Sequence, residues 1–295
     1  MRLKRLIEKK TKKFIIKKLS NNFSTLFQSF NLSQRPYCDI PYVNIKFYKS
    51  SSLAKRGEVI SLKIDGQTLP KILETGTFDD FLYKFLKDKL KKNSLFIDVG
   101  SNHGLVSKQV SNIKYIKKII CFEPVKSIFE LSKLNLKNIK KLKQYNFGWS
   151  KKNGNLPLYE NPSNSGDFSL ISNKQRNIRH IFKFKKANDE LQKIITNNKN
   201  LSLILKTDCQ GYDIEIFNNL DNIFLKKIHI YFLECKDLTE NNRMKFYEKI
   251  KFFNKIFVSC PLINKNTKLI KISDMDNYFK LKLEFDLILL NTNIK

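Results

Sequence analysis

The chain has 295 residues, of which 41% are hydrophobic, so it can bury a sizeable core and wholesale disorder is excluded. Its 56 Lys and Arg residues outnumber its 27 Asp and Glu residues, which gives a formal net charge of +29. That charge attracts polyanions, namely nucleic acid, anionic lipid or acidic glycans. Because Lys, Asn and Ile are all abundant, a diffuse compositional bias is the competing explanation.

Residues 1–57 are expected to form a basic arm that is partly helical. Within residues 1–20, apolar side chains recur at helical spacing among Lys and Arg: Leu3, Leu6, Ile7, Phe14, Ile15 and Leu19. This pattern fits a helix on an anionic membrane surface, a targeting segment, or a solvated basic helix packed on the domain by one face. No apolar run reaches the roughly 18–20 residues of a membrane-spanning helix. Residues 31–41, which hold two prolines, are expected to be a loop.

From residue 58 the pattern changes, and residues 58–92 are expected to form a hairpin and a helix. The runs VISLKI and QTLPKIL flank Asp65 and Gly66, and an Asp-Gly pair between alternating apolar runs predicts a hairpin turn. Between residues 78 and 90, apolar side chains recur on one helical face.

The rest of the chain alternates short apolar runs with polar helical segments. The runs are LFIDVG (95–100), KIICFEP (118–124), KQYNFG (143–148), LSLILKTD (201–208), IHIYFLE (228–234) and FDLILLN (285–291). The helical segments are 104–113, 126–138, 211–220 and 241–253. Runs without alternation predict strands buried on both faces, so the fold class is α/β with a doubly wound, mainly parallel sheet. This core spans residues 93–295 of a domain at 58–295, with an insertion at 150–200.

In such a sheet, ligands bind beyond the carboxyl ends of the strands, where the strand order switches. The loop after the first run, DVGSNHG (98–104), carries two glycines and leads directly into a helix. Glycines let the backbone approach a ligand, and a helix N-terminus offers unpaired N–H groups. The G-x-x-x-G spacing does not match the dinucleotide fingerprint, which disfavours a dinucleotide oxidoreductase.

Acidic side chains close three of the apolar runs. Glu123 follows Gly104 by 19 residues and is backed by Pro124, so it is placed to accept both hydroxyls of a ribose that lacks a 2′-phosphate. Asp208 and Glu234 close two later runs and are expected at the rim of the sheet. Asp213 lies in the first turn of the following helix, where the helix dipole favours its charge.

The cysteines and histidines do not indicate a metal centre. The five cysteines (Cys38, Cys121, Cys209, Cys235 and Cys260) have no CxxC spacing, and their number is odd. They are typical of reduced core cysteines in an intracellular protein, which predicts a cytoplasmic chain, peripheral at a membrane if residues 1–20 bind one. The three histidines have no HExxH-like spacing, so we expect no bound metal.

Several ordered blocks resemble the FkbM family of methyltransferases, whose pattern is roughly DVGANxG, FEP…N, N-x-ALS…G, KIDVEGxE and a late strand ending in Glu. In this chain the blocks are FIDVGSNHG, CFEP with Leu131 and Asn135 beyond it, NFGWS with Gly154 behind it, LKTDCQGYD, and IYFLE. The resemblance covers about residues 58–291. It implies a class I, seven-stranded Rossmann-like sheet with an N-terminal extension, the cofactor S-adenosyl-L-methionine, and methylation of a hydroxyl on a sugar, glycolipid or polyketide.

The resemblance also implies roles for individual residues. The methionine part of the cofactor would be held by Asp98, Gly100, Ser101, Asn102 and Gly104. Glu123, with Pro124, would hold the ribose, and Asn146 would lie near the adenine. Asp208 would face the transfer site, and a loop at residues 166–169 would close over the substrate.

A hydroxyl acceptor must lose its proton at the transition state, so a base is needed. Asp208 is the first candidate, and His103, whose ordinary pKa suits the task, is the second; the alternative for His103 is an ordinary surface-loop histidine. The chain departs from the family pattern at Gln210, where the family has Glu, and at Gly148 and Trp149, where it has Ala-Leu. Gln cannot act as a base, so Gln210 predicts a loss of transfer if the family's Glu is essential to it.

Two alternatives stay open. One is an RNA 2′-O methyltransferase, whose Lys-Asp-Lys-Glu set could draw on Asp208, Lys236 and Glu284; amino-directed nucleic-acid enzymes would need an (N/D)PP(Y/F) loop that is not found after the fourth run. The other is a catalytically degenerate scaffold that binds polyanions or a membrane surface through Lys-rich segments. The acceptor itself would be selected by residues 150–200 and the N-terminal arm.

Overall fold

The computed structural model describes residues 27–33, 42–63, 68–161, 167–174, 178–235, 240–260, 267–280 and 284–294. The helix expected within residues 1–20 lies outside these ranges, as do Cys38 and Lys236.

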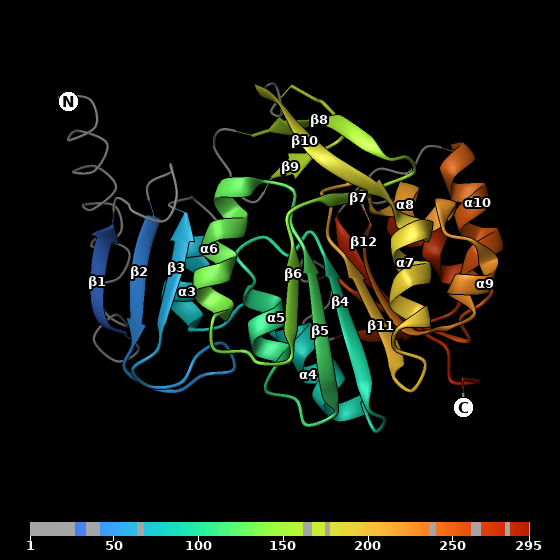
Figure 1. Ribbon diagram of the computed structural model, residues 1–295. Helices are drawn as coiled ribbons and strands as arrows, with labels where there is room; N and C mark the ends of the chain where they lie inside the picture. Colours follow the sequence, from blue (N-terminus) through green and yellow to red (C-terminus); the bar gives the residue numbers. More distant parts are fainter. Residues whose placement is uncertain are drawn as a thin grey trace.

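A central eight-stranded sheet forms the body of the molecule, in the order β14-β13-β15-β12-β11-β4-β5-β6 (Figure 1). Its strands are β4 (Ser94–Val99), β5 (Ile116–Phe122), β6 (Leu142–Tyr145), β11 (Ser202–Thr207), β12 (Ile228–Cys235), β13 (Lys255–Ser259), β14 (Lys268–Ile270) and β15 (Phe285–Leu290). Neighbours among β6, β5, β4, β11 and β12 are parallel, and β15 pairs antiparallel with both β12 and β13. The expected α/β, mainly parallel sheet is confirmed; in the described part of the chain β14 adds an eighth strand at the edge of β13.

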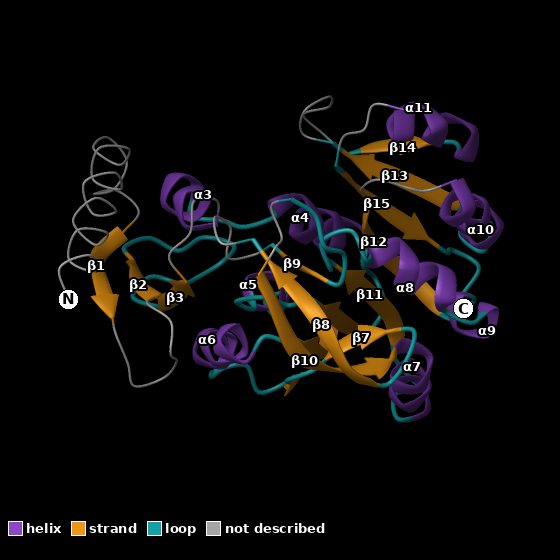
Figure 2. Cartoon of the chain, turned by 90° about the horizontal axis from the view of Figure 1, so that it is seen from above, coloured by secondary structure: helices purple, strands orange, loops and turns teal. Residues whose placement is uncertain are grey.

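Helices cover both faces of this sheet, as a doubly wound fold requires (Figure 2). They are α4 (Asp80–Lys89), α5 (Leu105–Val110), α6 (Lys126–Leu136), α7 (Ala187–Thr196), α8 (Asp213–Asn219), α9 (Asn222–Leu225), α10 (Glu240–Ile250) and α11 (Met275–Lys280), the last preceded by a 3₁₀ turn (Ile272–Asp274). Apolar side chains of α4 and α5 pack with Phe96 on one face, and those of α7 to α11 pack with Leu95 and Ile97 on the other. Consecutive residues of β4 therefore point into two different cores, which explains its unbroken apolar pattern.

The N-terminal part is a separate antiparallel sheet of β1 (Phe27–Ser33), β2 (Tyr42–Phe47) and β3 (Val59–Lys63). β1 includes residues 31–33 of the expected loop, and β2 belongs to the segment expected to be a basic, partly helical arm. β2 pairs with β3 across the expected boundary at residue 57. The alternation in YVNIKF, with Val43, Ile45 and Phe47 fully buried, is the strand signal that accounts for this pairing.

The hairpin expected at Asp65-Gly66 is wrong. Its first run forms β3, but its second run lies in helix α3 (Thr68–Thr75). Leu69, Ile72 and Leu73 have i, i+3, i+4 spacing and are all buried, so they act as one helical face rather than as alternate residues of a strand. Pro70 lies in the first helical turn, where the missing N–H costs little.

The insertion forms a four-stranded sheet in the order β7-β10-β8-β9, which stands above the carboxyl ends of the central strands (Figure 1). Its strands are β7 (Gly148–Ser150), β8 (Gly154–Glu160), β9 (Phe168–Ser169) and β10 (Ile178–Lys186). Leu158 and Phe184 pack with Val125 and Ile128 at the start of α6, which fixes this small sheet to the edge of the core.

The strand order switches between β4 and β11. The chain leaves β4 toward β5 and β6 on one side, and after the insertion it returns at β11 and continues to β12 on the other. The carboxyl ends of β4 and β11 therefore face a crevice, which is where doubly wound sheets bind ligands.

The described cysteines are all free thiols: Cys121, Cys209, Cys235 and Cys260. Within the described ranges, no group of three or more His, Cys, Asp or Glu side chains is arranged to hold a metal ion. In the same ranges, no helix combines the length and the apolar character that a membrane crossing needs.

Candidate functional site

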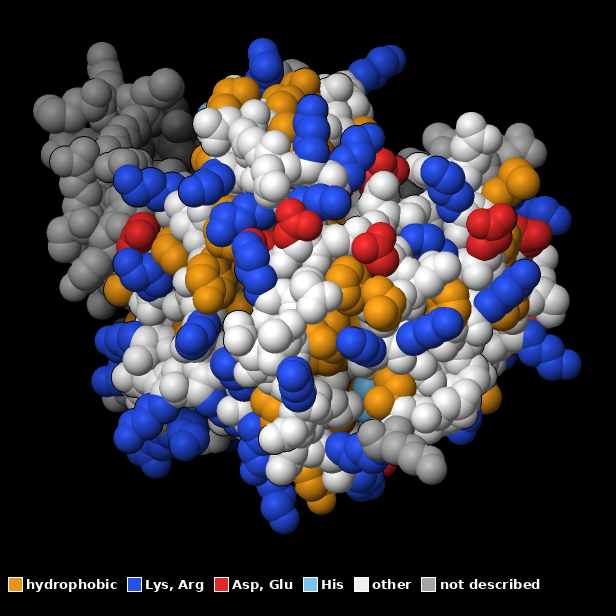
Figure 3. All heavy atoms as spheres, turned by 45° about the vertical axis from the view of Figure 1, so that its right-hand side comes forward, with side chains coloured by type: hydrophobic (Ala, Val, Ile, Leu, Met, Phe, Trp, Pro, Cys, Tyr) orange, Lys and Arg blue, Asp and Glu red, His pale blue; other side chains and the backbone are white. Residues whose placement is uncertain are grey.

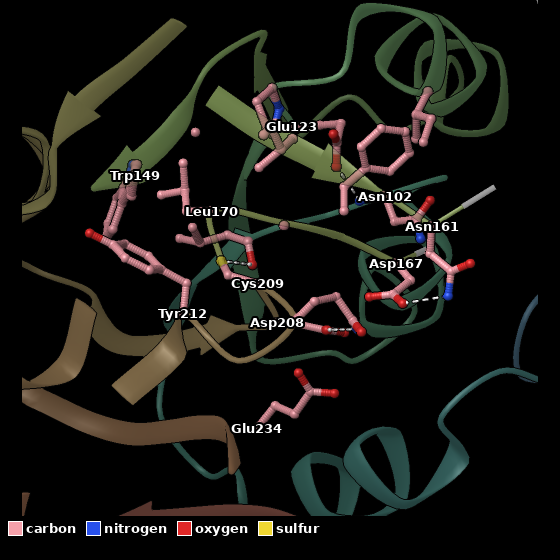
Figure 4. Close-up of a pocket in the computed structure, with 18 of the residues that line it drawn as sticks. Asn102, Glu123, Trp149, Asn161, Asp167, Leu170, Asp208, Cys209, Tyr212 and Glu234 are labelled. Carbon is pink, nitrogen blue, oxygen red and sulfur yellow. Dashed lines mark hydrogen bonds between the residues drawn. The ribbon is translucent and has the colours of Figure 1, made fainter. Parts of the chain in front are cut away.

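A cavity of about 410 Å³ lies at the switch point (Figure 4). Its floor is formed by residues at the carboxyl ends of β4, β5, β11 and β12, and its roof by the small sheet of the insertion. Residues of α3 and the α3–α4 turn close one side.

The loop after β4 approaches its neighbours so closely that side chains are excluded at two positions. Gly100 has φ +75°, and a Cβ there would lie 2.1 Å from the carbonyl oxygen of Asp208. Gly104 has φ +76°, and a Cβ there would lie 2.6 Å from Leu136 in α6. Asn102, between them, is also left-handed at φ 49°. Of these, Gly100 and Asn102 line the cavity.

Glu123, at the end of β5, is held in place by two backbone N–H groups. Asn102 N donates to Glu123 Oε2 at 2.9 Å, and Val125 N donates to Oε1 at 2.8 Å. Burial raises the pKa of this carboxyl to about 7, although the two hydrogen bonds act in the opposite direction. Each carboxylate oxygen can accept a further hydrogen bond, so Glu123 can still bind hydroxyl groups in the cavity.

Lys206 connects the carboxylates of the two strands at the switch point. It is in register with Asp98, and its Nζ lies 3.4 Å from Asp98 Oδ1 and 3.1 Å from Asp208 Oδ2. Burial acts to lower the pKa of Lys206, but the attraction of Asp208 and Asp98 outweighs it and raises the pKa. The sequence-based prediction missed Lys206; its signal was the i, i+2 spacing to Asp208, which puts both side chains on one face of a strand.

Asp208 lines the cavity with its carboxylate fixed on both oxygens. Lys206 donates to Oδ2, and Gln210 Nε2 donates to Oδ1 at 3.1 Å. Gln210 has a left-handed backbone, φ 54°, which turns its side chain back toward Asp208. Gln210 thus holds the Asp208 carboxylate in one orientation.

The side of the cavity formed by β12 and β15 is acidic. Burial, together with the charge of Asp208, raises the pKa of Glu234; burial, together with Asp79 and Asp208, raises the pKa of Asp286. Asp79 is paired with Lys71 at 2.9 Å. The sequence did not predict Asp286 because its run begins at the cavity edge, whereas ligand-binding residues are expected after the end of each run.

The charge of the cavity is opposite to that of the chain. Among the described residues, seven acidic side chains and a single basic one line it, whereas the whole chain has twice as many basic residues as acidic ones. On the surface, Lys and Arg side chains are spread over the face in Figure 3 rather than gathered in one patch. The acidic cavity is therefore a local feature that the composition does not explain.

Several predicted residues lie behind the cavity wall. Asp98 is fully buried beneath the loop, where it accepts a hydrogen bond from Ser107 Oγ at 2.7 Å. Ser101 is buried, and its backbone N–H donates a hydrogen bond to the carbonyl of Phe122. Together with Gly104, these residues shape the loop but do not line the cavity.

The structure does not bring His103 to the cavity. The side chain is 1% exposed, and its Nε2 accepts a hydrogen bond from the Lys63 N–H of β3 at 3.1 Å. An accepting Nε2 is a neutral imidazole nitrogen committed to the N-terminal sheet. The alternative interpretation of His103, an ordinary histidine on the surface of the loop, is also wrong because the residue is buried.

Asn146 and Pro124 fix the turn that carries Glu123. Asn146 Nδ2 donates to the carbonyls of Glu123 and Pro124, at 2.8 and 3.1 Å, and Asn146 does not line the cavity. Pro124 does line it, as do Asp167 and Phe168 of the loop expected to cover the substrate.

Trp149 is a further lining residue that the sequence did not single out as a ligand contact. Its ring packs on Phe122, with centroids 5.0 Å apart, and it is 1% exposed. In the described part of the chain, neither Trp149 Nε1 nor Asn102 Oδ1 has a hydrogen-bond partner. A buried polar atom without a partner on a cavity wall is a candidate ligand contact.

No family model matches the chain, and no curated protein matches it. Among solved structures it is similar to an rRNA methylase from Streptococcus thermophilus, with a TM-score of 0.39, 10% identity, and coverage of 71% of this chain and 93% of that one. It is also similar to a proposed methyltransferase from Streptococcus mutans in complex with SAH (TM-score 0.38, 14% identity, 72% and 96% covered). A third is a SAM-dependent O-methyltransferase from Thermotoga maritima (TM-score 0.36, 10% identity, 84% and 77% covered). At these TM-scores and identities, the similarities assign neither cofactor nor substrate to this chain.

Proposed function

We propose that this protein is an S-adenosyl-L-methionine-dependent methyltransferase that acts on a hydroxyl oxygen of a small acceptor such as a sugar or a glycolipid head group. One observation carries the proposal. Glu123, fixed by two backbone N–H groups, and Asp208, fixed by Lys206 and Gln210, line the same cavity at the switch point of a doubly wound sheet. The first carboxylate suits a ribose, and the second suits an acceptor that must lose a proton.

The residues present fit the cofactor. Glu123 would bind the ribose hydroxyls. Asn102 Oδ1, an acceptor without a partner among the described residues, would bind the ammonium group of the methionine part. Trp149 Nε1, a donor that also has no partner among the described residues, would face a ring nitrogen of the adenine. Gly100 leaves the floor of the site free of a side chain, which lets a ligand approach the backbone.

When bound, S-adenosylmethionine would supply a methyl group on a sulfonium; the acceptor oxygen would bond to the methyl carbon, and the electron pair of the broken carbon–sulfur bond would stay on sulfur. Asp208 takes the hydroxyl proton. Lys206 and Gln210 hold the Asp208 carboxylate in one orientation, and such alignment lowers the barrier of an in-line displacement. His103 has no part in this proposal because it lies outside the cavity.

The charge of the cavity favours a small acceptor over RNA. A polynucleotide would bring phosphates close to the Asp208 carboxylate, which repels them, and Lys71, the single basic residue among the described lining residues, is already paired with Asp79. The Lys-rich surface can still bind polyanions without leading them into the cavity.

Transfer of a labelled methyl group to a panel of sugars, glycolipids and RNA tests the proposal. Asp208→Asn should lower turnover by about 10²–10⁴-fold while leaving the affinity for S-adenosylhomocysteine nearly unchanged. Asp189→Asn, an exposed change on α7, is the matched control and should keep full activity. Full activity of the Asp208 variant would rule out Asp208 as the base. Labelling of RNA alone would rule out a small acceptor in favour of RNA.

A further inference from the structure

The carboxylates of the cavity are arranged along one edge of the central sheet. Adjacent strands are β5, β4, β11, β12 and β15, and they place Glu123, Gly100, Asp208, Glu234 and Asp286 in that order. Glu234 and Asp286 are in register, so they are neighbours across β12 and β15. Figure 4 shows Asp208 between Glu123 and Glu234.

This order separates the cofactor from the acceptor. The proposed ribose contact, Glu123, directly follows β5, and Glu234 lies on β12, three strands further, a separation of roughly 14 Å at the usual strand spacing. The proposed base, Asp208, lies between them. Glu234 and Asp286 are therefore on the side of Asp208 where the acceptor would bind.

The two lysines at the site are already paired with carboxylates other than Glu234 and Asp286. Lys71 pairs with Asp79, and Lys206 pairs with Asp98 and Asp208. Within the described ranges, neither Glu234 nor Asp286 forms an ion pair. Glu234 is only 8% exposed, it lines the cavity, and its Oε2 has no hydrogen-bond partner there. A buried carboxylate oxygen without a donor costs free energy, and a ligand that brings positive N–H groups would offset that cost.

We infer that the acceptor carries a protonated amine close to its reacting hydroxyl, as an amino sugar or another amino alcohol does, and that Glu234 and Asp286 bind the ammonium group. The inference rests on the proposed function, because that function identifies which side of Asp208 the acceptor occupies. An ammonium group has three N–H donors, enough to supply Glu234 Oε2 and the Asp286 carboxylate together.

The surrounding charges agree with this assignment. Glu234 faces Asp208, Asp213 and Glu284, and its pKa is raised by burial, by the repulsion of these groups and by a side-chain hydrogen bond with Glu284. Asp286 faces Asp79, Asp208 and Glu284, with Lys206 as the opposing charge, and its pKa is raised as well. This side of the cavity is short of positive charge, which a bound ammonium group would supply.

The test measures binding of small probes to the full-length protein saturated with S-adenosylhomocysteine, at constant ionic strength. Glucosamine and ethanolamine are compared with glucose, N-acetylglucosamine and ethylene glycol, which lack the positive charge. At least one amine should bind about tenfold or more tightly than its neutral counterparts. Glu234→Gln should remove this preference, whereas Glu130→Gln, at a partly exposed position of α6 outside the cavity, should keep it.

Each outcome supports or overturns the inference. Equal affinity of amines and neutral compounds, with S-adenosylhomocysteine bound, would overturn it and leave the proposed function intact. Failure to bind S-adenosylhomocysteine would instead count against the proposed function. Glu234→Gln should unfold at no lower denaturant concentration than the wild type; a clear loss of stability, repeated by Asp286→Asn, would mean that these carboxyls serve the fold.

Discussion

Backbone conformation at single residues determines how the cavity is formed. Gly100 brings the loop after β4 against the carbonyl of Asp208, so the two loops of the switch point are in direct contact. Asn102 uses its own N–H, in a left-handed conformation, to hold Glu123. The two carboxylates proposed to act on cofactor and acceptor thus depend on the same short loop.

Gly100→Ala should lower the free energy of unfolding more than Gly57→Ala does. Both glycines have positive φ, +75° and +85°, but a Cβ at Gly57 meets nothing within 4 Å, so that change costs only the conformational strain, about 1–2 kcal/mol. At Gly100 the clash with Asp208 should add about 1–3 kcal/mol. Denaturant unfolding of both variants measures the difference, and equal costs would contradict the close contact.

Glu123 should make stability depend on pH. Its pKa is about 7 in the folded chain against an ordinary 4.5, so the folded state keeps a proton that the unfolded state loses. The contribution of Glu123 to stability is therefore fully present below about pH 4.5 and is lost as the pH rises toward about 7. In that window the wild type should lose up to about 1.4 kcal/mol more per pH unit than Glu123→Gln. Identical slopes in denaturant unfolding would argue against a raised pKa.

The sequence predicted the carboxylates of the site better than it predicted the rest. Glu123 and Asp208 could be found because strand ends are marked by the apolar runs before them. His103 could not be placed, because its direction depends on the left-handed turn at Asn102, which has no sequence signal as clear as a glycine. Asp286 enters the cavity from an antiparallel strand, whose first residue, not its last, lies at that edge.

At the level of elements, α6 joins the core to the N-terminal sheet through one side chain. Asn135 Oδ1 accepts from Ser61 N at 2.7 Å, and its Nδ2 donates to the carbonyls of Ser61 and His103 at 2.8 and 2.9 Å. The Asn135 amide thus makes the two hydrogen bonds to Ser61 that a neighbouring strand would make beside β3. Asn135 is 3% exposed, so water does not substitute for these bonds.

Asn135→Leu should lower the free energy of unfolding by about 3 kcal/mol or more, because it leaves three buried backbone groups without partners. Asn219→Leu is the matched control: its side chain donates to the Glu215 carbonyl at an exposed position, and its change should cost less than about 0.5 kcal/mol. Denaturant unfolding of the two variants measures both costs. Similar small losses would mean that Asn135 does not tie the two parts together.

The order of the core elements was predictable, and the N-terminal topology was not. Each core strand is a continuous apolar run because both of its faces are buried. In residues 58–75, by contrast, a turn signal of two residues competed with a helical face of Leu69, Ile72 and Leu73, and the contact of that face with the core decided the outcome. β2 pairs with β3, and the alternation within one strand does not indicate which other segment of the chain will pair with it.

For the whole molecule, a basic exterior surrounds an acidic cavity. The exterior charge is exposed and therefore screened by salt, whereas the contacts inside the cavity are partly shielded from it. Polyanion binding by the surface and cofactor binding by the cavity should therefore respond differently to salt concentration.

Binding of an RNA oligonucleotide should fall steeply between about 50 and 200 mM salt, while the affinity for S-adenosylhomocysteine should change little. Saturating S-adenosylhomocysteine should not displace the RNA, since the two would occupy different sites. Fluorescence anisotropy at several salt concentrations, with and without the cofactor product, measures both effects. Competition between the two ligands would place RNA in the cavity and favour the RNA 2′-O alternative.

The central claim is that the cavity at the switch point binds the cofactor through Glu123. Calorimetric titration of the purified protein with S-adenosylhomocysteine, beside NAD as the control ligand, tests it most directly. We expect micromolar binding of S-adenosylhomocysteine, no binding of NAD, and a loss of about 1–3 kcal/mol of binding free energy in Glu123→Ala. No binding of S-adenosylhomocysteine at millimolar concentration, or an affinity that Glu123→Ala leaves unchanged, would contradict the claim.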